Sequence, residues 1–223
     1  MFQTAMAIGG SVSLNNGATI TNKSVTTSST NFLGSTIMSG GPVVINGAGQ
    51  TQVSNGSGGL QNSSTSGNIQ NDIADNNSQM SFSNLWNNFF SQSKSTVQSS
   101  ANQSYNSSNI SGATGKTIWT SDLSLNSNMT IGSTSSPVIL IVNGTFNSTG
   151  TVTINGLLYV MGSAAMNGST TINGLFATEG AFNSNGPLTI NYNPGILTGA
   201  GSINSNTNTV YSTVPANVQE QFP

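Results

Sequence analysis

The sequence predicts an all-β fold, a single-stranded parallel β-helix (solenoid) with rungs of about eighteen residues and one amphipathic helix inserted in it or capping it. The first observation is a pattern of eighteen residues that recurs five times without a gap between Ile118 and Thr207. The second is that apolar residues stand two apart within each unit, between glycines at fixed positions, as in short strands separated by turns. Helical repeats need about 30 or more residues, so this unit favours stacked strands that share one continuous core.

Superposition of the units gives columns of like residues. We expect the apolar columns to face the core: Ile154, Ile172 and Ile190; Ile139, Leu157 and Leu175; Phe146, Ala164 and Phe182; Val152, Thr170 and Leu188. Glycine columns mark the turns: Gly144, Gly162 and Gly180; Gly150, Gly168 and Gly186. One more column holds Asn155, Asn173 and Asn191. It predicts an asparagine ladder, with side-chain amides hydrogen-bonded from rung to rung, in preference to a ligand-binding role.

The pattern predicts one continuous domain. Residues 1–60 form N-terminal solenoid rungs, because Ile8, Val12, Leu14 and Ile20 repeat the spacing of Val160, Ala164, Met166 and Ile172. Residues 61–115 form polar loops with an amphipathic helix at about 83–100, residues 116–210 form the regular rungs, and residues 211–223 form a tail. The solenoid therefore begins at the N-terminus of the chain.

The predicted helix carries its large apolar residues on one face, with Ser81 or Ser83 as its N-cap. That face consists of Leu85, Trp86, Phe89, Phe90 and Val97. We expect it to be buried, either along the side of the solenoid or over an open end, where it would shield strand edges. The alternative is that the aromatic residues anchor a neighbouring subunit.

The charge content excludes several classes of function. The chain has three Lys, no Arg, five acidic residues, no His and no Cys, and a net charge of −2. A basic surface for nucleic acid is absent, and so are the usual metal ligands, bases and thiol nucleophiles. We therefore expect no enzyme activity, no cofactor and no metal site. The acidic residues are scattered along the chain: Asp72, Asp75, Asp122, Glu179 and Glu220. Of these, Glu179 is expected to face solvent.

The sequence favours a location outside the cell. No stretch reaches the eighteen apolar residues that suggest a membrane span, and an export signal would have to have been removed. Eleven Asn-x-Ser/Thr sites suit a glycosylated protein, although a chain this rich in Asn, Ser and Thr forms such sites by chance. They are Asn22, Asn55, Asn62, Asn76, Asn102, Asn106, Asn109, Asn128, Asn143, Asn147 and Asn167.

Several segments resemble a known family. GSVSLNNGATI, the mid-chain helix, PVILIVNGTFNSTGTVTINGLLYVMG and NGPLTINYNPGIL are similar to the β-helical extracellular region of PilX-like type IV pilus-associated proteins. The resemblance implies the solenoid fold and a cell-surface setting. In that family a pilin-like hydrophobic helix precedes the solenoid, and this sequence shows none. The solenoid is then expected to be the assembling part, much as bactofilin-like solenoids polymerise end to end.

These observations predict a structural subunit of an extracellular or cell-surface filament that assembles by self-association. A non-closing head-to-tail contact between the first and last rungs would propagate as a filament. The expected contact residues are Ile8, Val12, Leu14, Trp86, Phe89, Phe90 and Tyr211. The alternative is an adhesin that presents Thr, Asn and Ser ladders to glycans or, less favoured, to ice. Its Thr column is Thr153, Thr171 and Thr189, whereas the column two residues earlier is mixed: Thr151, Ser169 and Pro187.

Overall fold

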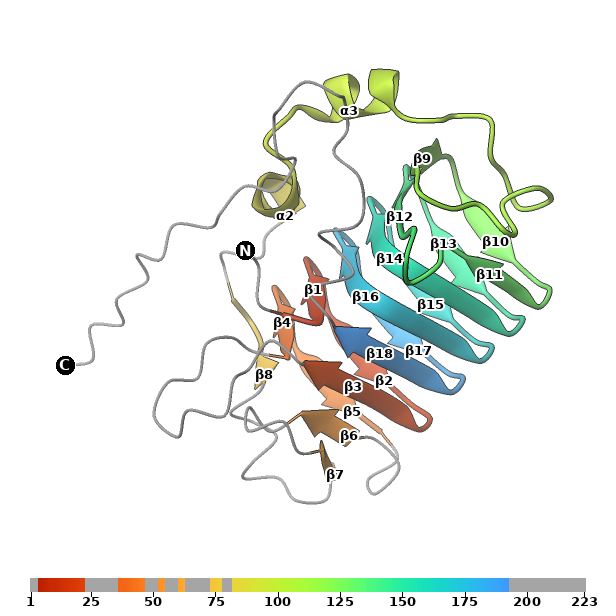
Figure 1. The fold of residues 1–223 in the computed structure, drawn as a ribbon. Coiled ribbons are helices and arrows are strands. Elements are labelled where there is room, and N and C mark those ends of the chain that lie inside the picture. The colour runs from red at the N-terminus through yellow and green to blue at the C-terminus, as the bar shows by residue number, and fades with distance from the viewer. Residues whose placement is uncertain are drawn as a thin grey trace.

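A computed structural model describes residues 4–22, 36–46, 52–54, 60–62, 73–77 and 82–192 of the chain, with the backbone alone for 52–54, 60–62 and 82–84. β-Strand is the commonest secondary structure of the described residues, and the strands form a 12-stranded sheet and a 6-stranded sheet. The strands pair in parallel except for β6 (Gln52–Ser54) and β7 (Leu60–Asn62), which are antiparallel. Figure 1 shows the strands lying one above another in a single stack. The predicted mostly-β, parallel architecture is confirmed at this level.

The stack is made of tiers, which we define as stretches that carry three strand segments each. Within a tier the first and third segments belong to the 12-stranded sheet and the second to the 6-stranded sheet. In spatial order, tiers 1 to 6 are residues 117–131, 138–155, 156–173, 174–192, 6–22 and 37–54. Tier 1 holds β9 (Thr117–Thr120), β10 (Leu123–Leu125) and β11 (Met129–Ile131), and tier 2 starts with β12 (Val138–Val142) and β13 (Phe146–Ser148). Strand β14 (Val152–Val160) ends tier 2 and begins tier 3, and β16 (Thr170–Thr178) ends tier 3 and begins tier 4. The second segment of tier 3 is β15 (Ala164–Met166). Tier 4 continues with β17 (Phe182–Ser184) and β18 (Leu188–Tyr192). Tier 5 holds β1 (Met6–Ile8), β2 (Val12–Leu14) and β3 (Ala18–Asn22), and tier 6 holds β4 (Ile37–Ser39), β5 (Val43–Ile45) and β6.

The two long strands carry the chain from one tier to the next. Each bends at a glycine in the left-handed region, Gly156 (φ 137) in β14 and Gly174 (φ 144) in β16. A Cβ at Gly174 would collide with the backbone carbonyl oxygen of Gly156 in the tier below. Only glycine permits this corner, because it tolerates the positive φ and lets two backbones approach closely.

The eighteen-residue register holds through tiers 2 to 4. Ile154 pairs with Ile172 and Ile172 with Ile190, as predicted, and all three side chains are fully buried. The predicted register is wrong at tier 1, where Ile118 pairs with Leu140 and not with Ser136. The reason is a longer connection between the tiers, closed by a hydrogen bond from the N–H of Ser136 to the carbonyl of Ser133.

The order of the tiers differs from the order of the chain. Tier 5, near the N-terminus, lies directly on tier 4, so β3 pairs with β18 and β2 with β17. In Figure 1 the red strands lie beside the blue ones. The expectation that the N-terminal rung is an open end is therefore wrong. The two tiers match in side-chain type: Ile20 pairs with Ile190 on the inner side, and Thr19 pairs with Thr189 on the outer side.

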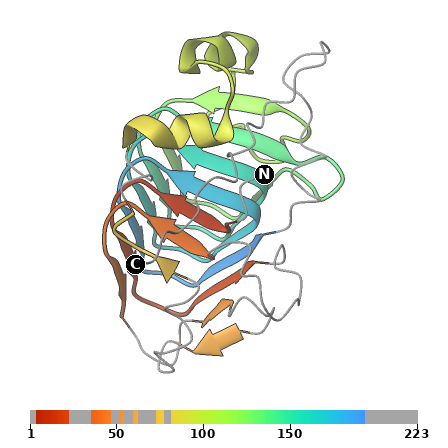
Figure 2. The same ribbon diagram turned by 90° about the vertical axis from the view of Figure 1, so that its left-hand side faces the viewer.

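Two short helices replace the single one predicted. Helix α2 (Phe82–Phe89) lies across the first segments of the tiers (Figure 2), and α3 (Lys94–Ser100) follows it. The chain breaks between them because Ser93 starts α3, where its side chain accepts a hydrogen bond from the N–H of Thr96. The predicted caps Ser81 and Ser83 lie outside the residues whose side chains are described. None of the helices in the described part of the chain is both long enough and apolar enough to span a membrane.

The segment after α3 covers the tier 1 end of the 12-stranded sheet. Asn102 forms an isolated parallel bridge with Ile118, with hydrogen bonds at 2.9 Å to Thr117 and from Trp119. Further on, the N–H of Gly112 donates to the carbonyl of Thr130 at 2.8 Å. Residues 101–115, expected to be a polar loop, thus protect the edges of β9 and β11. At the other end β8 (Ile73–Ala74) pairs with β4.

Candidate functional site

A column of five threonines runs along the outer side of the third strand segments. Neighbouring strands place Thr130, Thr153, Thr171, Thr189 and Thr19 side by side in tiers 1 to 5. Adjacent parallel strands lie about 4.8 Å apart, so the hydroxyl groups repeat at that interval. The sequence showed three members of this column. The other two were missed because the register changes at tier 1 and because tier 5 comes from the N-terminus.

The predicted asparagine ladder lies two residues further along the same strands, and its hydrogen bonds are present. Asn191 donates from Nδ2 to Oδ1 of Asn173 at 3.1 Å, and Asn173 donates to Oδ1 of Asn155 at 3.0 Å. Asn155 completes the ladder by donating to the carbonyl of Gly132 at 3.1 Å. We call the threonine column and this ladder together the ladder face.

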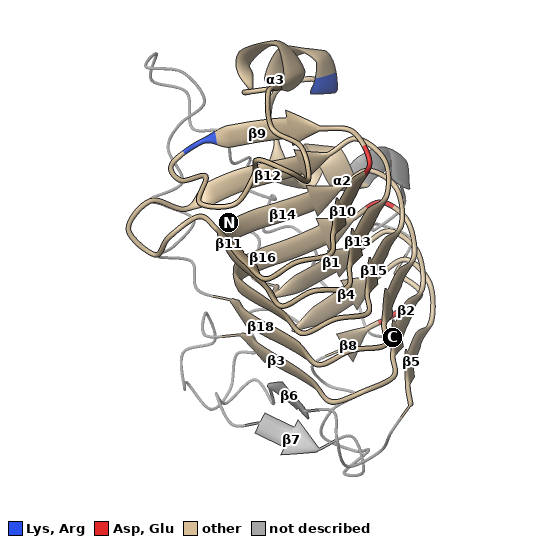
Figure 3. Ribbon diagram, turned by 90° about the vertical axis from the view of Figure 1, so that its right-hand side faces the viewer, with Lys and Arg blue, Asp and Glu red and all other residues tan. Residues whose placement is uncertain are grey.

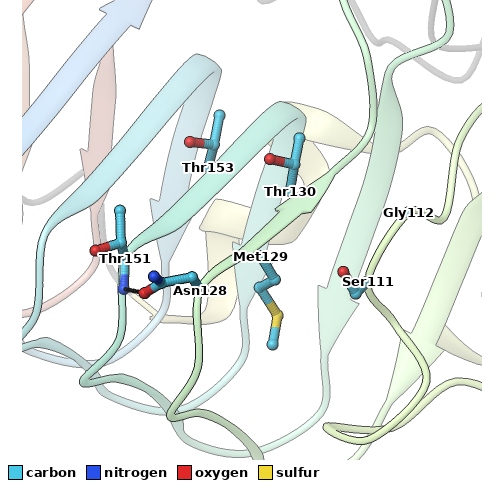
Figure 4. A pocket seen from close by; sticks show the side chains of 7 residues that line it. All are labelled: Ser111, Gly112, Asn128, Met129, Thr130, Thr151 and Thr153. Atoms are coloured by element: carbon cyan, nitrogen blue, oxygen red, sulfur yellow. Dashed lines mark hydrogen bonds between the residues drawn. The ribbon is translucent and has the colours of Figure 1, made fainter.

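A shallow trough of about 510 Å³ lies at the tier 1 end of the ladder face. Its lining is Ser111, Gly112, Asn128, Met129, Thr130, Thr151 and Thr153. Figure 4 shows the side chains of Thr130 and Thr153 side by side on neighbouring strands. Oδ1 of Asn128 accepts a hydrogen bond from the N–H of Thr151 at 3.2 Å, which fixes the orientation of that amide. The trough contains hydroxyl and amide groups and no charged side chain.

The chemistry of the ladder face follows from these groups. A threonine hydroxyl both donates and accepts hydrogen bonds, and an asparagine amide does the same with its two ends. The described charged residues lie elsewhere, at α3, at the start of β9 and in the turns that follow the first strand segments (Figure 3). The face therefore suits a neutral partner that offers hydroxyl groups at repeated intervals, and it lacks the groups that bind phosphates or carboxylates.

A second polar ladder, which sequence reasoning missed, occupies the corner after the second strand segments. Its column is Asn126, Thr149, Asn167, Asn185, Asn15 and Asn46. Asn185 donates to Asn167 at 2.8 Å, and Asn15 donates to Asn185 at 2.8 Å. The signal was available, since Asn167 and Asn185 are eighteen residues apart. Because its amides bond to one another, this corner ladder stabilises the turn of each tier.

A buried polar cluster joins the helices to the sheet. The hydroxyl of Tyr159 donates to Oε1 of Glu179 at 2.8 Å, and Nζ of Lys94 lies 2.6 Å from the same oxygen. Glu179 is only 7% exposed, so the expectation that it faces solvent is wrong. Burial, reinforced by the nearby Glu179 carboxylate, raises the pKa of Tyr159 far above its ordinary value. The sequence pattern missed the cluster because its members come from three separate elements.

Three aromatic residues at the C-terminal half of α2 and just after it, Trp86, Phe89 and Phe90, are buried against this cluster. Trp86 meets Tyr159 edge-on at 5.2 Å between ring centroids, and Phe89 and Phe90 meet it at 5.6 and 5.4 Å. The predicted burial of the aromatic face is confirmed. Exposures of 4%, 3% and 1% leave Trp86, Phe89 and Phe90 no surface with which to anchor a neighbouring subunit.

The remaining interface candidates are equally enclosed or not described. Ile8, Val12 and Leu14 are buried in tier 5, where their strands pair with tier 4 on one side and tier 6 on the other. Within one copy the strands of this tier pair with strands of the same chain on both sides, and a role in contacts between copies stays a prediction. Tyr211 lies outside the described residues.

The Asn-x-Ser/Thr sites differ in accessibility. Asn22 is fully buried. Asn102 and Asn147 are half-buried, and the exposed sites are Asn76, Asn106, Asn109, Asn128, Asn143 and Asn167. The side chains of Asn55 and Asn62 lie outside the description. In the folded chain a glycan would fit the exposed sites, and Asn128 would place it in the trough.

The acidic residues in the described part of the chain form no group of three or more potential metal ligands. Asp122 is exposed, and Oδ1 accepts hydrogen bonds from the N–H and the hydroxyl of Thr145 at 2.6 and 2.9 Å. These bonds lower the pKa of Asp122 below its ordinary value. Asp75 is exposed, and Asp72 and Glu220 lie outside the description. Among the described residues Asp75, Asp122 and Glu179, no hydrogen bond or ion pair joins one carboxylate to another.

Comparison with known proteins gives no relative: no family model matches the chain, and neither a curated protein nor a solved structure does. The resemblance to PilX-like proteins therefore stays a prediction, and function has to be argued from the geometry.

Proposed function

We propose that this chain is a non-enzymatic binding module of the cell surface or exterior, in which a parallel β-solenoid presents the ladder face to neutral, hydroxyl-rich polymers such as glycans. The observation that carries the proposal is the uncharged column of five threonines that ends in the trough beside Thr130. Regular strand spacing repeats the same donor and acceptor groups about every 4.8 Å. A repetitive ligand can therefore make the same contact several times, and multiple weak contacts add to useful avidity.

The solenoid supports this role by holding the face rigid. Parallel registers continue through all six tiers, and the inner residues of the third segments, such as Ile154 and Ile172, are fully buried. Asparagine ladders on the ladder face and at the corner fix the tiers relative to one another. Preorganised groups lose little conformational entropy on binding, which favours affinity.

The geometry favours this reading over a filament built by stacking first and last rungs. The two tiers expected to meet between copies, tiers 5 and 4, already pair with each other within one chain. At the tier 1 end, residues 101–115 cover strand edges that a second copy would need. Of the helices that the structure describes, neither lies on the ladder face: α2 packs on Tyr159 in the first segments, and α3 reaches Glu179 through Lys94.

The proposal is tested with an array of neutral and charged glycans, followed by titration of each hit. Thr171→Glu places a carboxylate in the middle of the threonine column, and we expect a loss of at least about tenfold in affinity, or 1.4 kcal/mol. Ala165→Glu is the matched control, since Ala165 is half-buried in tier 3 on the outer side of the 6-stranded sheet. Absence of binding to every neutral glycan, or equal losses in both variants, would refute the assignment of this face.

A filament subunit remains the second candidate because of one observation at the 6-stranded sheet. Among the described strands, β10 and β5 each pair on one side only, and they lie at opposite ends of that sheet. Strand β5 is apolar, and Val44 is 47% exposed. Uncharged apolar edge strands are prone to pair with another chain, and a β5-to-β10 contact would not close on itself.

Electron microscopy of the purified protein tests whether it forms filaments through the β5 and β10 edges. If fibres form through these edges, Val44→Lys should shorten or abolish them, whereas Ala165→Lys should leave their length unchanged. Fibres of normal length from a folded Val44→Lys protein would exclude this edge, and a native protein that stays monomeric at every concentration would exclude the filament.

A further inference from the structure

The chain consists of two parts held together by strand pairing. We call the described residues from 4 to 77 the arm and residues 82–192 the body. The strand pairings that join arm and body form a seam: β1 with β16, β2 with β17 and β3 with β18. In sequence, the two parts are connected through residues 78–81.

The seam has the geometry of a contact between consecutive tiers. Across it the N–H of Gly9 donates to Thr178 at 2.7 Å, and the N–H of Asn15 donates to Ser184 at 2.8 Å. Between tiers 3 and 4, which are consecutive in the chain, the N–H of Gly180 donates to Gly162 at 2.9 Å. The seam therefore needs matched strands and does not need the two tiers to be close in sequence.

Both sides of the seam depend on being covered. On the body side Phe182 is 2% exposed, and on the arm side Val12, its partner in the register, is 1% exposed. Removal of the arm would expose apolar surface and a row of unpaired backbone groups along tier 4, both of which are costly in water. The body thus requires an arm, while nothing in the register distinguishes its own arm from that of another copy.

No chemical feature of the seam ties an arm to its own body. The chain has no cysteine, so no disulfide crosses the seam. Residues 4–22 contain no charged side chain, so two copies meet no electrostatic barrier there. The helices belong to the body, since Trp86 packs on Tyr159 and Lys94 pairs with Glu179. The link through residues 78–81 is then the only covalent constraint on where the arm goes.

We propose that the arm is exchangeable, so that the body of one copy accepts the arm of a second copy across the same seam. Reciprocal exchange gives a closed dimer, and exchange in series gives an open chain of copies. The partner is a second molecule of this chain, and the contact is the head-to-tail strand pairing already present in the monomer. This inference is independent of glycan binding, because the arm supplies the same strands in either form.

The experiment uses single cysteines in an otherwise cysteine-free chain. Thr19 and Thr189 are direct neighbours across the seam, and paired strands lie within the Cα range that a disulfide spans. A tagged Thr19→Cys protein is mixed with an untagged Thr189→Cys protein, unfolded, refolded together at low and high concentration, and oxidised. We expect disulfide-linked heterodimers whose fraction rises with concentration. The matched control is Thr153→Cys mixed with Thr171→Cys, both neighbours within the body, which should give no heterodimer beyond background.

Two results would overturn the proposal. One is a heterodimer fraction no higher than the control at any concentration, while a Thr19→Cys/Thr189→Cys double variant closes its disulfide within a single chain. The other is obtained without cysteines: unmodified protein refolded at high concentration that sediments only as a monomer. Glycan binding, measured on the unmodified protein, reports separately on the ladder face.

Discussion

Tyr159 and Glu179 meet in a hydrogen bond of 2.8 Å beneath helix α2, where the carboxylate also pairs with Lys94. The contact joins two tiers, and through Lys94 it joins them to α3. It attaches the helical segment to the sheet through polar groups, alongside the aromatic packing of Trp86 and Phe90 on the same tyrosine ring. The strength of this attachment can be measured.

Removal of Lys94 alone should lower the unfolding free energy more than removal of the Lys94 and Glu179 charges together. Lys94→Met leaves the Glu179 carboxylate enclosed with only the tyrosine hydroxyl, and we expect a loss of about 1 kcal/mol in unfolding free energy, moderated by the 43% exposure of the Lys94 side chain. In a Glu179→Gln background the same substitution should be nearly neutral, because the neutral amide leaves no enclosed charge for Lys94 to balance. Denaturant unfolding of the four proteins in this cycle checks the coupling, and additive effects would contradict it.

Alkaline pH should destabilise the fold through buried tyrosines. Burial raises the pKa of Tyr192 to about 12 from an ordinary value of 10.0, and burial raises that of Tyr159 further. Unfolded tyrosine ionises near pH 10, so the contribution of both groups is fully present below that pH and is lost as pH rises toward 12 and above. Tyr192→Phe and Tyr159→Phe should each flatten the fall in melting temperature over this range. An unchanged slope in both would contradict the stated cause.

A methyl group at the glycine where β16 bends between tiers should destabilise the fold. Gly174→Ala forces a Cβ against the carbonyl oxygen of Gly156 at a positive φ, and we expect a loss of about 3 kcal/mol or more, from steric overlap added to backbone strain. Gly112→Ala is the matched control, because Gly112 also has a positive φ (77) but has no atom near its Cβ position. It should lose only about 1 to 2 kcal/mol. Equal losses in denaturant unfolding would show that tier spacing does not require glycine.

A charged side chain in the buried isoleucine column of Ile154, Ile172 and Ile190 should destabilise the fold. Ile172→Asp places a carboxylate among fully buried apolar residues, and the expected loss in unfolding free energy is about 3 to 5 kcal/mol. Thr171→Asp points outward from the neighbouring position on the same strand and should change stability by less than about 1 kcal/mol. Thermal melting of the two variants checks the assignment of inner and outer sides, and an unchanged melting temperature for Ile172→Asp would refute it.

Features that depend on the strand period could be predicted from the sequence. The columns through Ile172 and Asn173 follow from alternation within each strand and from identical spacing between units. The burial of Trp86 and Phe90 follows from their position on one helical face. These properties are local or repeat at a fixed interval, so a single sequence contains them.

The order of the tiers and the buried cluster could not be predicted in the same way. Thr19 and Ile20 have the same pattern as Thr189 and Ile190, so the sequence shows that these strands are equivalent without showing that they are neighbours. Glu179 occupies a turn position that faces solvent in an isolated rung, and it is buried here where Tyr159 of the next tier and Lys94 of α3 meet it. Both features are set by how separate segments meet in space.

Because tiers 4 and 5 are neighbours, tier 5 can pair with tier 4 only after the body has been synthesised. Strands β1, β2 and β3 leave the ribosome before the body does, and the partners they pair with in tier 4 appear about 170 residues later, an interval of roughly 10 to 30 s at ordinary elongation rates. During that time uncharged apolar strands have no cover from the body. If arms are exchanged between copies, exchange would be favoured during this interval wherever several copies are synthesised close together.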